Sequence, residues 1–182
     1  RELTNLFTLV SHVKHLKIEV FNLRLHGRDW EKMICQYLPQ LETFALSMST
    51  TVSETANEQD HKKLIDAYLQ SYTSSFWLDR KWFVRCHSRM SHRALSIRLH
   101  TLPYEFDAIP SSEDDYGCRT TSTAPSDAFF GYDTVRSVNY RSSVFADGVY
   151  SGVQLKNVEV LTISLPTDQH FFTVFPRLDD LF

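Results

Sequence analysis

The chain is short of the residues that nucleotide-binding and hydrolytic sites use for their tight turns. Glycine occurs only 5 times in 182 residues, and there is no glycine-rich phosphate loop, no Gly-Lys-Ser/Thr and no Gly-x-Ser-x-Gly. Phosphate cradles and nucleophile elbows depend on such backbone turns. The sequence therefore gives no reason to expect a nucleotide-dependent enzyme or a hydrolase, and we predict no cofactor.

Cysteine and an excess of one charge are also lacking. The three cysteines, Cys35, Cys86 and Cys118, are odd in number and widely spaced, and no Asn-x-Ser/Thr site occurs. Both observations favour an intracellular location, cytoplasmic or nuclear. The 19 basic and 22 acidic residues give a formal charge of −3, which argues against a dedicated nucleic-acid binder. No apolar run reaches the roughly 18 residues that a membrane span requires, so we expect no membrane partner.

What the chain does have is enough apolar residues for one sizeable core. Hydrophobic residues make up 42% of the sequence and aromatic residues 13%, which predicts a folded chain and a single domain over residues 1–182. The sequence begins at Arg1 and ends inside an apolar phrase at Phe182, and we interpret it as a piece of a longer protein.

A spaced apolar phrase occurs three times. Its successive apolar residues are separated by three, three, two and two positions. This spacing indicates a turn followed by alternation, as expected of a short strand with one buried face. The copies are Val10-Val13-Leu16-Ile18-Val20, Leu38-Leu41-Phe44-Leu46-Met48 and Leu155-Val158-Leu161-Ile163-Leu165.

The spacing of these copies is typical of repeat proteins. Leu16 and Phe44 are 28 residues apart, and a weaker copy at Tyr132-Val135-Val138-Tyr140 places Val138 23 residues before Leu161. These distances lie within the roughly 20–29 residues of a leucine-rich repeat. Val138 lies 94 positions after Phe44, so an irregular central segment must interrupt the repeats.

The segments after the first two copies predict helices. The first helix has an apolar face formed by Trp30, Ile34 and Leu38, and Pro39 ends it. The second covers residues 61–74 and has an apolar stripe from Leu64 to Tyr72 at the same helical spacing. We expect both stripes to be core.

The central segment is different. Residues 82–87 and 95–100 are rich in β-forming residues and predict a hairpin or neighbouring strands of one sheet. Residues 107–133 carry few apolar anchors and predict a flexible loop.

Candidate chemistry is confined to this central segment. Cys86 precedes His87, and His92 and His100 follow, but no Cys-x-x-Cys pair is present and we predict no metal site. Alternation puts His100 on the same side as Arg98, which suggests a solvated face. Cys86, on an aromatic strand, is interpreted as a core residue, although a Cys–His site in this block remains the alternative, enzymatic hypothesis.

Two serines form a possible regulatory site. Ser111 and Ser112 are each followed three residues later by an acidic residue, the pattern that acid-directed kinases favour. Phosphorylation there would add charge to an already acidic loop.

The phrases VKHLKIEVF, LPQLETFAL and NVEVLTISLP resemble those of divergent leucine-rich-repeat proteins. The stretches SFWLDRKWFVRCH and IRLHTLPYEFD are similar to a large invertebrate family whose members often carry an F-box ahead of such repeats. The resemblance implies an α/β leucine-rich-repeat-like solenoid with a mainly parallel sheet on its concave side and helices and loops on its convex side. It also implies a substrate-binding role in a ubiquitin ligase, with the ligase adaptor bound through an F-box that this sequence does not contain.

In such a solenoid, alternation directs a second set of strand residues outward along the concave surface. We predict these as the residues that bind a protein partner: Lys17, Glu19, Ala45, Ser47, Thr162 and Ser164. The chain is thus expected to be a non-catalytic interaction scaffold. An enzyme built on the central block and a purely structural repeat protein are the alternatives.

Overall fold

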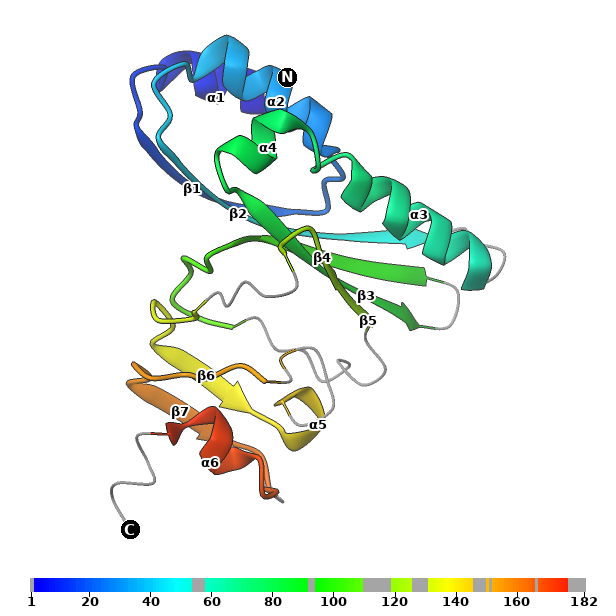
Figure 1. Ribbon diagram of the computed structural model, residues 1–182, viewed down its shortest axis with the longest axis vertical. Helices are drawn as coiled ribbons and strands as arrows, with labels where there is room; N and C mark the ends of the chain where they lie inside the picture. Colours follow the sequence, from blue (N-terminus) through cyan, green and yellow to red (C-terminus); the bar gives the residue numbers. More distant parts are fainter. Residues whose placement is uncertain are drawn as a thin grey trace.

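Helices cover the upper face of a central sheet, and a smaller C-terminal layer lies beneath it (Figure 1). The structure is a computed structural model that describes residues 2–53, 58–91, 94–109, 119–125, 131–145, 150, 152–165 and 167–176. Within these ranges, no helix combines the length and the apolar composition needed to cross a membrane.

The first half of the chain contributes helices and strands in alternation. In chain order these are α1 (Glu2–Leu9), β1 (His15–Phe21), α2 (Gly27–Tyr37), β2 (Thr43–Ser53), α3 (Glu58–Gln70) and α4 (Ser75–Asp79). The remaining elements are β3 (Phe83–Ser91), β4 (Ala94–Leu102), β5 (Arg119–Ser122), β6 (Ser137–Tyr140), α5 (Ser142–Phe145), β7 (Val160–Ile163) and α6 (Phe171–Val174).

The main sheet has five strands in the order β1-β2-β4-β3-β5. Only β1 and β2 are parallel, while β4, β3 and β5 are each antiparallel to their neighbours. A second, two-stranded sheet pairs β6 with β7 in parallel. The β3–β4 pairing confirms the hairpin predicted for residues 82–87 and 95–100.

The predicted solenoid with a mainly parallel sheet is wrong. The first two apolar phrases do pair in register, Leu16 with Phe44, but the third lies in the other sheet, where Leu161 pairs with Val138. The antiparallel strand β4 occupies the side of β2 on which a further parallel strand would lie. An apolar phrase indicates a short strand, but it does not specify which strand lies beside it or in which direction that strand runs.

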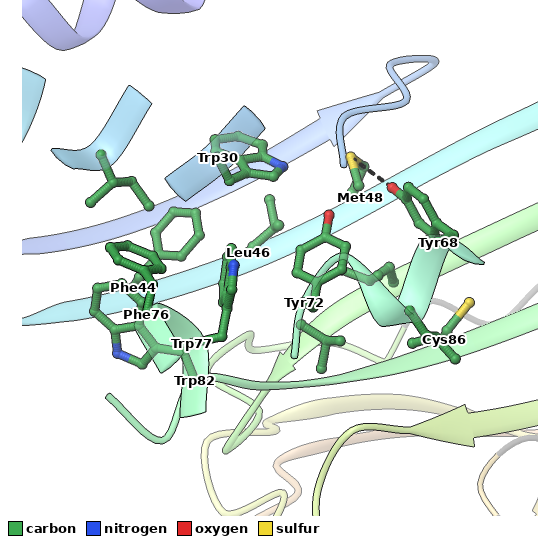
Figure 2. Packing of buried hydrophobic residues seen from close by; sticks show 14 of the residues in the cluster. Trp30, Phe44, Leu46, Met48, Tyr68, Tyr72, Phe76, Trp77, Trp82 and Cys86 are labelled. Atoms are coloured by element: carbon green, nitrogen blue, oxygen red, sulfur yellow. Dashed lines mark hydrogen bonds between the residues drawn. The ribbon is translucent and has the colours of Figure 1, made fainter. Parts of the chain in front are cut away.

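The upper core is built on aromatic rings between the sheet and the helices (Figure 2). Phe44 packs within 6.1 Å, between ring centroids, of each of Trp30, Trp77 and Trp82. The two predicted helical stripes are confirmed as core, because Trp30 and Ile34 of α2 and Tyr68 of α3 are buried.

The lower core lies between the underside of the sheet and the C-terminal layer. It gathers fifteen buried residues: Ala45, Tyr104, Phe106, Ile109, Tyr132, Val135, Val138, Tyr140, Val144, Phe145, Tyr150, Val153, Leu155, Val174 and Phe175. Ala45 comes from β2, so the central sheet is buried on both faces at this point. Strand β5 lies inside the segment predicted as a loop, residues 107–133, of which 110–118 and 126–130 lie outside the described residues.

Candidate functional site

The six predicted binding residues do not form one surface. Lys17 and Glu19 are exposed on β1, whereas Ala45 on β2 is only 6% exposed and Ser47 is half-buried. Thr162 and Ser164 lie on or beside β7, in the other sheet. The continuous concave face that the solenoid required is therefore absent from the described part of the chain.

The underside of the main sheet is covered by the segment that follows β4. Lys17 Nζ lies 3.4 Å from Asp107 Oδ1 and 5.1 Å from the centroid of the Phe106 ring. Ala45 packs in the same core as Tyr104 and Phe106. Residues 104–109 thus occupy the space in front of β1 and β2 where a partner was expected to bind.

Two histidines and a tyrosine form a buried polar cluster beneath the same sheet. His87 on β3 and His100 on β4 are each 3% exposed, and their ring centroids are 5.2 Å apart. His87 Nδ1 lies 2.9 Å from Thr120 Oγ1, and His100 Nε2 lies 3.4 Å from the Tyr132 hydroxyl. Arg85 Nη1 donates a hydrogen bond of 2.7 Å to that hydroxyl. The solvated face predicted for His100 is wrong, because the lower layer covers it.

Both histidines are held in the neutral form. Burial lowers the pKa of His87 well below its usual value, and the nearby His100, Arg85 and Arg98 lower it further. Burial, with a smaller contribution from Arg85, lowers the pKa of His100 to about 3. A histidine with such a pKa is a poor general base near neutral pH.

The cluster also lacks a nucleophile. Cys86 and His87 are successive residues of β3 and point to opposite faces of the sheet, with Cys86 in the upper core and His87 above the lower layer. Burial raises the pKa of the Cys86 thiol to about 12, far from the value of a reactive thiolate. In the described ranges no three His, Cys, Asp or Glu side chains are placed to hold a metal ion. His92, Ser111 and Ser112 lie outside the described residues.

Sequence reasoning missed most of this cluster. Arg85 and Tyr132 are 47 residues apart, and nothing local indicates that they meet. The only available signal was the run of aromatic residues in 104–132, which could have suggested a layer that covers the histidine face. The cluster is best understood as a buried polar contact that fixes the lower layer against the sheet.

Strand β7 is the most open edge of the small sheet. The amide of Val160 donates to the Arg136 carbonyl, and the amide of Ser164 donates to the Tyr140 carbonyl, so both face β6. Main-chain groups alternate in direction along a strand, and those of Leu161 and Ile163 therefore point away from β6. In the described part of the chain no strand pairs with this side of β7.

Apolar side chains on and just after β7 are also exposed. Leu165 is 82% exposed, Val160 58% and Ile163 42%. Natural edge strands are commonly protected by charged side chains or bulges, but Val160–Ile163 carries no charge. An exposed strand edge with apolar neighbours is the kind of surface to which an extended chain adds.

Comparisons with protein-family models, with curated proteins and with solved structures found no match to this chain.

Proposed function

We propose that the chain is a non-catalytic protein-binding module that captures an extended segment of its partner along the free edge of β7. The observation that carries this proposal is the side of β7 that pairs with no strand in the described part of the chain, together with the exposed Ile163 and Leu165. Backbone groups of the strand would give the affinity, and the flanking apolar side chains would select the partner.

The alternative enzymatic site in the central block is disfavoured by its own geometry. Cys86 and His87 point to opposite faces, and both histidines are buried and neutral. These features support a binding role over a catalytic one.

The place of this module in a ubiquitin ligase rests on the resemblance of its phrases to F-box-associated repeats. In this role the module would hold the substrate, and an F-box elsewhere in the full protein would bind the ligase adaptor in an intracellular compartment. Co-purification of the adaptor with the full-length protein, and its loss when the F-box is deleted, would support this role. A full-length reading frame with a secretion signal and no F-box would contradict it.

The test of edge binding is a proline substitution at Ile163. Its amide points away from β6, so proline removes a donor from the free edge and leaves the β6–β7 ladder intact. We expect Ile163→Pro to retain the thermal unfolding midpoint within a few degrees and to lose the proteins that the wild-type chain captures from its own cells, as identified by mass spectrometry.

The matched control places proline on an edge strand of the main sheet. Glu19 lies on β1, and its main-chain groups point away from β2 by the same alternation. Glu19→Pro should capture the same proteins from these cells as the wild-type chain does. Equal capture by wild type and Ile163→Pro would contradict the proposal.

A further inference from the structure

The three parallel junctions among the described residues share one main-chain contact. A carbonyl at the residue before one strand or bridge accepts the amide of the residue before the next strand and the amide of that strand's first residue. The Lys14 carbonyl accepts from Glu42 and Thr43 at 2.7 and 3.0 Å. The Asp107 carbonyl accepts from Arg136 and Ser137 at 2.8 and 3.0 Å, and the Arg136 carbonyl accepts from Glu159 and Val160 at 2.8 and 2.9 Å.

The same groups are present at β7 and at β1 without a partner strand among the described residues. Beside β7 there is the carbonyl of such a junction, and at the start of β1 there are the two amides. Glu159 occupies the position of Lys14 and Arg136, and its carbonyl has no main-chain partner among the described residues. The complementary amides are those of Lys14 and His15, which lie at the start of β1 as Glu42 and Thr43 lie at the start of β2. The acceptor is therefore the Glu159 carbonyl beside β7, and the donors are the Lys14 and His15 amides at the start of β1.

The direction of the free groups is also complementary. On β7 the main-chain groups that face away from β6 belong to Leu161 and Ile163, and on β1 those that face away from β2 belong to the odd-numbered residues His15 to Phe21. Neither set has a strand partner among the described residues. In the β1–β2 ladder, Thr43 donates to the Lys14 carbonyl and Leu16 pairs with Phe44. The same register places Leu161 beside Leu16 and Ile163 beside Ile18.

Side chains at these positions fit as well. The residues at the shared carbonyl position form ion pairs across two junctions, Lys14 with Glu42 at 2.7 Å and Arg136 with Glu159 at 3.5 Å. In each pair a basic residue just before one strand faces an acidic residue just before the next. A strand placed beside Glu159 should therefore carry a basic residue at this position, and β1 of a second copy carries Lys14 there. Both edges also expose apolar side chains. Leu165 is exposed just after β7, and Phe21, the last residue of β1, is 69% exposed.

We propose that the β7 edge of one copy binds the β1 edge of a second copy, which extends the small sheet in parallel across the two molecules. This inference rests on the proposed binding role of β7 and identifies the partner as the chain itself. The contact joins two different surfaces, so it does not close at two copies and adds further molecules in the same direction.

Sedimentation velocity of the purified chain over a range of concentrations tests this assembly. We expect an average mass that grows with concentration and passes beyond the dimer. Lys14→Glu and Glu159→Lys should each weaken association by roughly tenfold or more, because like charges then meet at the junction. The double variant, Lys14→Glu with Glu159→Lys, should recover association, because the charges are exchanged and complementary again.

A control separates this contact from the ion pair inside each copy. Glu42→Gln removes the partner of Lys14 within the chain but leaves Lys14 and Glu159 in place, so it should associate as the wild type does. Ile163→Pro and Glu19→Pro should both remain monomeric, since each blocks one of the two edges.

A chain that stays monomeric at all concentrations, a closed dimer, or association that neither charge reversal changes would overturn self-assembly. These outcomes are distinct from failure of the proposed function. A monomeric chain whose capture of other proteins is lost in Ile163→Pro would retain the binding role with a different partner. If Ile163→Pro captures other proteins as the wild type does, both the binding role of β7 and the self-assembly built on it would be contradicted.

Discussion

Cys35 and Cys86 differ in their exposure to solvent. Cys35 is exposed on α2, while Cys86 is fully buried in the upper core. Burial raises the pKa of the Cys86 thiol to about 12, so almost none of it is ionised at neutral pH. At the scale of single residues, alternation along β3 predicted the core position of Cys86 correctly.

This contrast gives a prediction for thiol labelling. In the native protein, a maleimide reagent should modify Cys35 within minutes and leave Cys86 unmodified. In denaturant both should react. Peptide mapping by mass spectrometry checks the result, and rapid modification of Cys86 in the native chain would contradict the packing described here.

The elements show how far a local pattern can be extended into a fold. The spacing around Leu16, Phe44 and Leu161 predicted three short strands, each with one buried face. All three strands exist, but the face of β7 predicted as buried is open, since Ile163 is 42% exposed. Their partners depend on residues far away in sequence, because β2 is bounded by a strand about fifty residues later that runs in the opposite direction. Nothing in residues 43–53 encodes that choice, and for this reason the solenoid prediction failed while the strand predictions held.

The candidate site shows the same limit. Alternation assigned Ala45 to the outward side of β2, and the side is correct, but that side is covered by Tyr104 and Phe106. The open edge of β7 could not be recognised either. Its sequence is that of a regular copy of the phrase, and only the topology shows that no described strand pairs with its outer side.

Ala45 therefore offers a test of the second layer. Ala45→Lys places a long charged side chain in the lower core and should lower the free energy of unfolding by about 3 kcal/mol. Thr162→Lys, at an exposed strand position, should change it by less than about 0.5 kcal/mol. Urea titrations of the two variants check this difference. Equal stability would mean that the outward face of β2 is open.

At the scale of the whole molecule, two cores share one sheet and a neutral histidine pair lies against the lower one. The fold buries His87 and His100 beside Arg85, with Arg98 also nearby, so neither histidine gains a proton readily. In the unfolded chain both would bind a proton below about pH 6.5. The unfolded state therefore binds more protons than the folded state in acid.

This difference predicts that stability decreases as the pH falls. The free energy of unfolding should change little between about pH 7 and pH 8 and should decrease below about pH 6.5, with His100 alone accounting for about 2 kcal/mol at pH 5. His100→Gln should lower the slope of this decrease, whatever its effect at pH 8. Denaturant titrations at several pH values measure the slope, and an equal slope in both proteins would contradict the assignment.

The distribution of aromatic residues has a consequence for every such measurement. Trp30, Trp77 and Trp82 are the 3 tryptophans of the chain, and all belong to the upper core, whereas the lower core holds tyrosines and phenylalanines but no tryptophan among its described residues. Indole fluorescence consequently reports on one side of the sheet only. Detachment of the C-terminal layer would leave that emission nearly unchanged, and it would become visible through tyrosine absorbance or through amide hydrogen exchange of β6 and β7.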